Sequence, residues 1–317
     1  MTDRGTRVAV AHYCEGAGHA SRMLAVTRAL ETAGYETVLA GGGPGRTFVE
    51  RNGYREYEPT PVDLIDGYQR GNPVTALAGA APALTGRVRD YAGWLRRERP
   101  AFLVADDISA AVAATLTRTP YYYLTHDPAG FYTTTAERVG ARVRNRFAVA
   151  TAELFALPKV WTGAPTIPGA EVVPPIAPAG GALDASVDVL VVPSAFTVSE
   201  DRLRTALERR GRSVTLVGGD DWTVAPSLQP YIERATVVVC SGYSTVMEAA
   251  VAGTPCIVLP HTSEQRGVVR ALADDVGFYA AASVDDVVSL LDRVEAPTPR
   301  PNGVDRFVEL VVEHAGR

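Results

Sequence analysis

The stretch from Cys240 to Glu248 carries the strongest chemical signal in the chain, and it reads Cys-Ser-Gly-Tyr-Ser-Thr-Val-Met-Glu. It follows an apolar run, Ala235–Cys240, with the composition of a buried parallel strand. The residues after the run open a segment with helical spacing. A strand that turns through Ser-Gly into a helix leaves unpaired N–H groups at the positive end of the helix dipole. We therefore predict a phosphate-binding turn. It consists of Ser241, Gly242, Tyr243, Ser244 and Thr245.

Glu248 adds a predicted contact to the sugar of a nucleotide. It lies about one helical turn past the cap, close enough to the phosphates to accept hydrogen bonds from a ribose. Gly253-Thr-Pro then stops the helix, and Cys256–Pro260 restarts a strand. The segment as a whole is typical of a binder of a nucleoside diphosphate, although a plain strand-turn-helix is the alternative.

A second loop with chemical potential follows the first strand, where Gly16-Ala-Gly18-His19 precedes a helical pattern. A dinucleotide fingerprint would need a third glycine near Arg22 and an acidic residue at Ala40, where the second strand ends. Neither is present, so an NAD site is disfavoured. The loop instead places His19 at a helix N-terminus, where a neutral imidazole suits a general base. A capping or purely structural histidine is the alternative.

A histidine base works best when a carboxylate orients its other nitrogen. Asp106 comes directly after the apolar run Phe102–Ala105, at the carboxyl end of a predicted strand. Asp107 is the fallback for the same role. The competing interpretation makes Asp106 the N-cap of a helix over 109–116.

The fold must position these loops. Strand and helix patterns alternate along the whole chain, and this alternation predicts an α/β fold of parallel sheets with helices on both faces. Pro and Gly dominate 163–183, which indicates a linker between two Rossmann-like domains that face a cleft. We expect an N-terminal domain over 1–165, a linker over 166–183, a second domain over 184–300, and a last helix within 301–317 that crosses back to the first domain. Both candidate loops lie at strand carboxyl ends, where ligands bind in such sheets.

The motif Ser-Gly-x-x-Thr-Val-x-Glu, then Ala-Gly-x-Pro, then an apolar strand ending in Pro and followed by Glu264-Gln265, resembles the donor-binding signature of GT-B glycosyltransferases. The similarity is greatest to the family 28 group and its family 1 cousins. The resemblance implies that Ser241, Gly242, Ser244 and Thr245 hold a UDP diphosphate, that Glu248 holds the ribose, and that the acidic-Gln pair holds the donor sugar.

The same resemblance assigns further roles. Trp222 stands where related enzymes place the uracil, with a packed loop aromatic as the alternative. Gly16 and Gly18 resemble the first glycine loop, whose His lies at the acceptor. Arg22 would bind an acceptor phosphate or lie on a solvated helix face, and His126 would contact the acceptor or belong to a local turn. The implied activity is inverting, metal-independent transfer of a hexose-type sugar from a UDP-sugar, a co-substrate, with no cofactor and no metal.

The charge, the cysteine positions and the N-terminal sequence indicate which partners and which compartment to expect. The chain has 317 residues and a net charge of −5, which argues against nucleic acid as the main partner. Cys14, Cys240 and Cys256 are scattered among predicted strands, and the N-terminus lacks the apolar core of a signal peptide. We expect a cytoplasmic protein. An arginine run over 138–146 allows peripheral contact with anionic lipid at the inner face of a membrane, although a solvated helix face is the simpler interpretation.

The acceptor is left open by the sequence: a lipid-linked group, a glycan or a small molecule, bearing a hydroxyl or a phosphate. Two alternatives to a transferase remain on the same fold. One is an enzyme like UDP-GlcNAc 2-epimerase, which needs no acceptor. The other is a non-catalytic nucleotide-sugar-binding subunit of a membrane-associated transferase.

Overall fold

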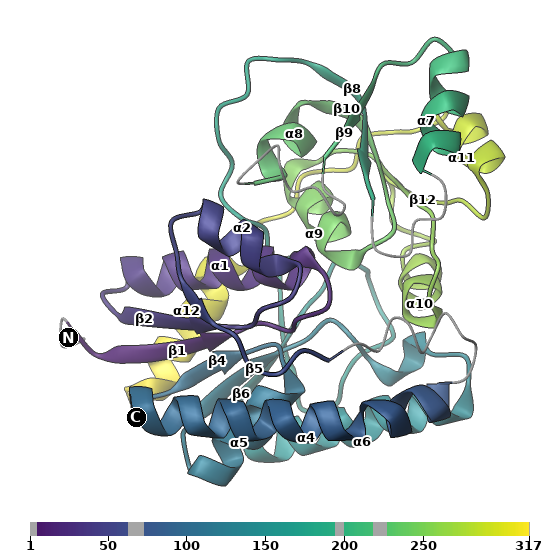
Figure 1. Cartoon of the computed structure of the whole chain (residues 1–317). Helices are drawn as coiled ribbons and strands as arrows, with labels where there is room; N and C mark the ends of the chain where they lie inside the picture. The colour runs from purple at the N-terminus through teal and green to yellow at the C-terminus, as the bar shows by residue number, and fades with distance from the viewer. Residues whose placement is uncertain (1–4, 63–72, 194–199, 218–226, 317) are drawn as a thin grey trace.

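The computed structural model describes residues 5–62, 73–193, 200–217 and 227–316. It contains two parallel sheets, each in its own lobe (Figure 1), so the predicted α/β fold is confirmed. Trp222 lies outside the described residues.

The first sheet has seven strands in the order β3-β2-β1-β4-β5-β6-β7. Its strands are β1 (Arg7–Ala11), β2 (Glu36–Ala40), β3 (Glu56–Tyr57), β4 (Leu103–Ala105), β5 (Tyr121–Leu124), β6 (Leu154–Pro158) and β7 (Glu171–Val173). The register sets Ala11 beside both Ala40 and Ala105 at the carboxyl ends of three neighbouring strands. Because parallel strands end at one edge, the loops that follow them meet there.

The second sheet has five strands in the order β12-β11-β10-β8-β9. They are β8 (Val187–Val192), β9 (Val214–Leu216), β10 (Ala235–Cys240), β11 (Cys256–Val258) and β12 (Phe278–Ala280). β10 lies between β8 and β11, and its last four residues are buried, as its unbroken apolar run predicts.

Helices cover both sheets (Figure 1). In the first lobe they are α1 (Ala17–Thr32), α2 (Gly45–Arg51), α4 (Pro73–Glu98), α5 (Ile108–Thr117), the short 3₁₀ helix η1 (Ala129–Phe131) and α6 (Thr135–Thr151). In the second lobe they are α7 (Glu200–Arg209), α8 (Gln229–Arg234), α9 (Tyr243–Ala252), α10 (Ser263–Ala271) and α11 (Val284–Leu290).

The last helix, α12 (Val304–Ala315), packs against α1 and β6 of the first lobe, as Figure 1 shows in yellow. Phe307 and Val311 are completely buried, in the same apolar cluster as Met23 and Leu24 of α1. The chain therefore crosses between the lobes twice.

Several elements differ from the sequence expectation. α6 and the strands β6 and β7 were not predicted. β7 falls inside the Pro- and Gly-rich stretch, but it pairs only with β6 and forms the edge of the sheet, where proline-rich sequence is tolerated. α1 begins at Ala17, so that Gly18 and His19, which the sequence places in a loop before the helix, belong to its first turn; Gly16 adopts φ 90° and turns the chain sharply into the helix.

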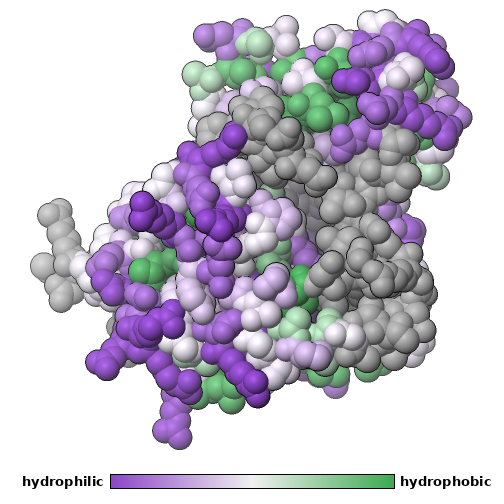
Figure 2. Space-filling model, in the orientation of Figure 1, coloured by the Kyte–Doolittle hydropathy of each residue, from purple (hydrophilic) through white to green (hydrophobic). Residues whose placement is uncertain are grey.

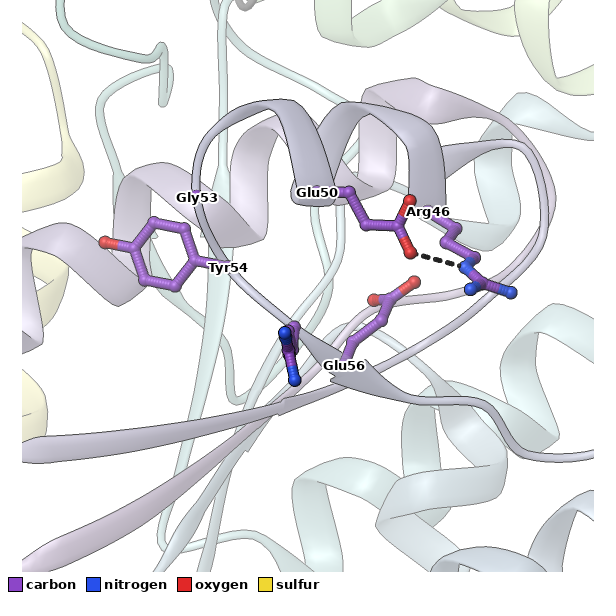
Figure 3. Close-up of a pocket in the computed structure, with 6 residues that line it drawn as sticks. Arg46, Glu50, Gly53, Tyr54 and Glu56 are labelled. Carbon is purple, nitrogen blue, oxygen red and sulfur yellow. Dashed lines mark hydrogen bonds and ion pairs between the residues drawn. The ribbon is translucent and has the colours of Figure 1, made fainter.

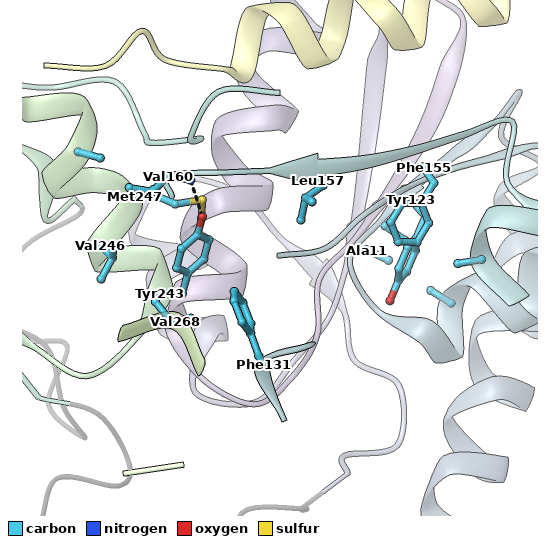
Figure 4. Packing of buried hydrophobic residues seen from close by; sticks show 14 of the residues in the cluster. Ala11, Tyr123, Phe131, Phe155, Leu157, Val160, Tyr243, Val246, Met247 and Val268 are labelled. Atoms are coloured by element: carbon cyan, nitrogen blue, oxygen red, sulfur yellow. Dashed lines mark hydrogen bonds between the residues drawn. The ribbon is translucent and has the colours of Figure 1, made fainter. Parts of the chain in front are cut away.

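One apolar cluster joins the two lobes. Tyr243 at the start of α9 packs against Trp161, with ring centroids 5.7 Å apart, and belongs to the same cluster as Phe131 and Val160 of the first lobe (Figure 4). Gly267 in α10 lies so close to Phe131 that a Cβ there would be 2.4 Å from the Phe131 Cα. The lobes are thus in tight contact along this line.

The surface is mixed. On the face drawn in Figure 2, hydrophilic side chains cover most of the coloured surface, and hydrophobic ones occur in small groups. Within the described residues, no helix combines the length and the apolar character that crossing a bilayer requires.

Candidate active site

The predicted pair of His19 and Asp106 is present. His19 sits in the first turn of α1, and Asp106 follows β4, so the strand-end rule brings them together. His19 Nδ1 lies 2.8 Å from Asp106 Oδ2. Burial would raise the pKa of the Asp106 carboxyl, but His19 and Arg22 outweigh it and hold that pKa well below its usual range. Arg22 Nη2 also lies 3.1 Å from Nδ1, but the ionised carboxylate is nearer and only accepts hydrogen bonds. We therefore place the proton on Nδ1, which leaves the lone pair of Nε2 for a base.

Arg22 lies one turn further along α1 and is only 1 % exposed, so it is not on a solvated helix face. Its Nη2 is 2.5 Å from Asp106 Oδ2, and its Nη1 is 3.3 Å from His126 Nδ1. The guanidinium therefore balances the Asp106 charge and reaches His126 at the same time. The Arg22 guanidinium thus forms its contacts with other side chains of the protein. These contacts neither require nor test the predicted role of Arg22 in binding an acceptor phosphate.

Asp107, the fallback for Asp106, has a different role. Its Oδ1 accepts from the backbone N–H of Ser109 at 2.8 Å and caps α5, so the N-cap alternative falls on Asp107 instead of Asp106. Its Oδ2 lies 2.7 Å from Arg87 Nε, and both side chains are fully buried. Arg87 also donates to the carbonyls of Gly41 and Thr60, which tie the loops after β2 and β3 to this pair.

The predicted phosphate turn has the expected geometry. α9 begins at Tyr243 with Gly242 as its N-cap, and the first-turn N–H groups receive no side-chain cap from the described residues. Ser241 and Thr245 are buried, at 3 % and 6 % exposure. The first-turn amides of α9 are thus available to an anion, as the motif predicts.

The phosphate turn meets the glycine loop of the first lobe. A Cβ on Gly18 would lie 2.6 Å from Ser244 Oγ, so only glycine fits there without displacement. One turn further on, Ser21 Oγ donates to Glu248 Oε1 at 3.2 Å. The N-termini of α1 and α9 therefore face each other directly, and His19 stands beside the place where they touch.

Tyr243 was predicted to bind the donor, but its side chain points into the first lobe. Its hydroxyl accepts from the Val160 N–H at 2.9 Å and donates to the Pro158 carbonyl at 3.1 Å, as the dashed line to Val160 in Figure 4 indicates. What Tyr243 offers a ligand is its backbone amide, while its ring fastens the turn to the end of β6.

Glu248 is 2 % exposed, and its Oε2 has no hydrogen-bond partner among the described residues. Burial raises the pKa of its carboxyl to about 7, against the opposing hydrogen bond from Ser21. An unpaired, buried carboxylate oxygen one turn beyond the phosphate turn is the geometry that the ribose hypothesis requires.

His126 bridges the lobes. It follows β5 in the first lobe, yet its ring stacks on Tyr243 at a centroid distance of 4.6 Å. Its Nε2 lies 3.4 Å from Glu264 Oε1 of the second lobe. Burial lowers the pKa of His126 well below its usual value, and the neighbouring Arg22 lowers it further. The residue predicted to contact the acceptor thus lies against the turn predicted to bind the donor.

Glu264 and Gln265 make different contacts. Gln265 Oε1 accepts from the backbone N–H groups of His261 and Thr262 at 2.7 and 3.2 Å, and completes a capping box at the start of α10. Glu264 is left to face the first lobe. Burial and the neighbouring Asp127 carboxylate raise the pKa of Glu264.

Three polar residues, Asp127, Tyr132 and Arg144, lie beside this pair, and sequence reasoning missed the contacts among them. Asp127 is 8 % exposed, and its Oδ2 lies 2.6 Å from Arg144 Nη2 and accepts from the Tyr132 hydroxyl at 2.8 Å. The sequence places Asp127 with His126 at a strand end, facing the cleft or in a local turn, but it does not indicate the contacts with Tyr132 and Arg144. Arg144 was expected with the arginine run on a surface, but it is bound here, while Arg142 and Arg146 remain exposed.

One hollow, of about 570 Å³, lies beside α2 and β3 and is lined by Arg46, Glu50, Tyr54 and Glu56 among others, none of them a predicted site residue (Figure 3). In the described part of the chain, no three His, Cys, Asp or Glu side chains converge as metal ligands.

The architecture and the paired loops define a class of fold, the two-domain GT-B fold, and solved structures share it. No protein-family model matches the chain, and no curated protein matches it either. The glycosyltransferase SsfS6 from Streptomyces sp. SF2575 is 14 % identical, with 98 % of this chain and 96 % of that one covered and a TM-score of 0.65.

Two further structures agree. The spinosyn rhamnosyltransferase SpnG is 16 % identical over 98 % of this chain and 96 % of its own, with a TM-score of 0.64. The glycosyltransferase SnogD from Streptomyces nogalater is 17 % identical over 99 % and 95 %, with a TM-score of 0.62. The structural neighbours are GT-B glycosyltransferases, and the predicted resemblance is confirmed at the level of the fold.

Proposed function

We propose that the protein is an inverting, metal-independent glycosyltransferase that moves a hexose-type sugar from a pyrimidine nucleoside diphosphate to an acceptor hydroxyl. The observation that carries this proposal is the meeting of two helix N-termini. One bears a histidine oriented by a buried aspartate, and the other bears unpaired amides. The sequence alone suggested uridine as the base. SsfS6 and SpnG have each been solved with thymidine diphosphate, so we extend the proposal to either pyrimidine.

The proposed reaction combines His19 of the first lobe with the helix N-terminus of α9 in the second. His19 Nε2 takes the proton of the acceptor hydroxyl, and the oxygen attacks the anomeric carbon as the bond from that carbon to the diphosphate oxygen breaks. The amides at the start of α9, with the hydroxyls of Ser244 and Thr245, stabilise the charge on the departing diphosphate. Asp106 stabilises the imidazolium that forms at His19. Glu248 Oε2 accepts from the ribose.

Fewer observations support a proposal for the class of acceptor. SpnG has been solved with the spinosyn aglycone, and the first lobe of this chain presents His19 in the same fold. We propose a small-molecule hydroxyl as the acceptor, and keep lipid-linked and glycan hydroxyls as comparisons in the assay. We further propose a cytoplasmic location.

The test is sugar transfer from radiolabelled UDP- and dTDP-sugars to a panel of these acceptors. His19→Ala and Asp106→Asn should each lower kcat by about 100-fold or more, because general base catalysis contributes at least that much. His314→Ala, at the far end of α12, serves as the control. Unchanged turnover in His19→Ala would remove the base assignment. Conversion of the donor without any acceptor would indicate an epimerase instead.

A further inference from the structure

His12, the residue directly after β1, is buried against a carboxylate. Its side chain is 3 % exposed, and that of Glu56 on β3 is 1 % exposed. His12 Nε2 lies 2.6 Å from Glu56 Oε2, and Glu56 Oε1 accepts from the Gly42 N–H at 3.0 Å. The other ring nitrogen, Nδ1, lies 3.0 Å from the carbonyl oxygen of Tyr13. Each nitrogen of the imidazole therefore faces an oxygen.

These contacts define the protonation state of His12. A carbonyl oxygen and an ionised carboxylate only accept hydrogen bonds, so both ring nitrogens must carry protons to satisfy them. Burial alone would lower the pKa of His12, but the hydrogen bond and the charge of Glu56 outweigh it and raise that pKa above its ordinary value of 6.5. The buried pair is therefore an imidazolium beside a carboxylate.

Titratable groups on the neighbouring elements also face His12, and they are Asp106 and Asp107 after β4 and Arg87 and Tyr91 on α4. The Asp106 carboxylate raises the pKa of His12 further. Arg87 and the Tyr91 hydroxyl approach the His12 carbonyl at 3.3 and 3.4 Å. The Arg87 charge is itself paired with Asp107 at 2.7 Å. The surroundings thus favour the charged form of His12.

Tyr13 connects this ion pair to the predicted base. Its carbonyl accepts from His12 Nδ1, and its backbone N–H donates to Asp106 Oδ1 at 2.8 Å. The Tyr13 ring meets the His19 imidazole edge-to-face, with centroids 5.4 Å apart. Its hydroxyl donates to Glu15 Oε2 at 2.6 Å. One residue thus contacts both His19 and Asp106 while its carbonyl is bonded to His12.

We propose that His12 and Glu56 are positioning residues: the ion pair holds Tyr13, and Tyr13 holds the His19–Asp106 pair in place for transfer. This role rests on the proposed transferase function. A neutral His12 has one N–H and can satisfy either the Tyr13 carbonyl or Glu56, while its other nitrogen turns a lone pair toward the remaining oxygen. Loss of the His12 proton therefore breaks one of the two contacts, and transfer slows as the pH rises.

Glu56→Gln removes the charge but can keep the hydrogen bonds. The new amide oxygen can accept from the Gly42 N–H, and the new NH₂ group can donate to Nε2 of a neutral His12. That neutral ring keeps its Nδ1–H on the Tyr13 carbonyl. The variant should therefore hold Tyr13 at every pH, whereas the wild type should hold it only while His12 is protonated.

The first measurement is kcat against pH for the best UDP- or dTDP-sugar. Wild-type kcat should rise with pH as His19 loses its proton, and should then fall by at least about 10-fold, because a displacement of about 1 Å can cost about 100-fold. Glu56→Gln should keep the rise and lose the fall. Glu50→Gln, whose carboxylate pairs with Arg46 on the surface in Figure 3, is the matched control and should keep both.

His12→Asn separates positioning from general damage. It should lower kcat at least about 10-fold, because the dyad is displaced, and leave the donor KM unchanged, because the phosphate turn lies in the other lobe. A merely structural role for His12 would move kcat and KM together or reduce only stability, and that result would overturn the inference. Glu56→Gln tests the proposal independently if His12→Asn does not fold.

The second measurement needs no substrate. Ring ¹⁵N chemical shifts distinguish a doubly protonated imidazole from a neutral one, and the signal missing from His12→Asn identifies His12. Above pH 6.5, His12 should be doubly protonated in the wild type and neutral in Glu56→Gln.

The two measurements separate the possible failures. A neutral His12 in a wild-type protein that still transfers sugar overturns the positioning role alone. An alkaline fall of equal size in wild type and Glu56→Gln overturns it as well. If His12 is doubly protonated but no donor is turned over at any pH, the proposed transferase function fails, and the positioning role fails with it.

Discussion

The hydroxyl of Tyr243 in the second lobe accepts a 2.9 Å hydrogen bond from the backbone N–H of Val160 in the first lobe. The same hydroxyl donates to the Pro158 carbonyl, and the Tyr243 side chain is 3 % exposed. The turn that we propose to bind a diphosphate is therefore bonded directly to the opposite domain at its first helical residue.

Tyr243→Phe should lower the free energy of unfolding by about 1–3 kcal/mol, because it leaves a buried amide and a buried carbonyl without partners. Urea unfolding measures the change. Tyr279→Phe is the matched control, since the Tyr279 hydroxyl accepts from Glu295 N near the surface, where water can replace it. An equal loss in both variants would contradict a special role for the interdomain contact.

Gly18→Ala should be destabilising even though alanine favours helices. The added Cβ would lie 2.6 Å from Ser244 Oγ, which forces the two helix N-termini apart. Gly140→Ala on α6 meets no neighbour and should stabilise by up to about 1 kcal/mol through helix propensity alone. Thermal unfolding compares them, and small-angle scattering should show an expanded Gly18→Ala protein. If both substitutions stabilise equally, the lobes do not meet as described.

Glu248 predicts a pH dependence of stability. Its pKa is about 7 in the folded protein, above the ordinary value of 4.5, so the folded state binds the proton more tightly. This contribution to stability is fully present below pH 4.5 and is lost as the pH rises through 7. Relative to Glu248→Gln, the wild type should lose about 3 kcal/mol across that window. Denaturant titrations at a series of pH values measure it, and parallel curves for the two proteins would refute the assignment.

Arg87→Met should cost about 3–5 kcal/mol of stability, because Asp107 would then be a buried, unpaired charge. The double variant Arg87→Met/Asp107→Asn should recover a substantial part of that loss. The exposed Arg7, which contacts Glu36 and Glu98, is the control, and Arg7→Met should cost less than about 1 kcal/mol. Strict additivity of the two single substitutions in the double-mutant cycle would count against the pair.

Much of the fold was predictable because it depends on local patterns. Unbroken apolar runs marked β1, β4 and β10, and the strand-end rule then placed His19 near Asp106 and both near the phosphate turn. The bounds of α6 and the strand β7 were missed because their apolar residues are interrupted by arginines or followed by prolines. β6 was missed although Leu154–Leu157 is an unbroken apolar run. Those strands acquire their order only from pairing in the sheet.

Contacts between distant residues were the part that the sequence could not supply. Arg22 was assigned to a ligand or to solvent, but its partners lie 84 and 104 positions away along the chain. Gln265 was assigned to the donor sugar, although the pattern Thr262-x-x-Gln265 is itself a capping signature and was visible in the sequence. Tyr243 was similarly assigned to the donor by its motif, and only its neighbours in space revealed what its side chain contacts.

The return of α12 to the first lobe affects the order of folding during synthesis. Phe307 and Val311 belong to an apolar cluster whose members outside α12 all precede them by more than 100 residues. Until α12 has been synthesised, the apolar side chains of α1 in this cluster lack their partners. A nascent chain stalled before 304 should therefore remain sensitive to protease, because α12 supplies packing that the first lobe cannot obtain from its own segment of the chain.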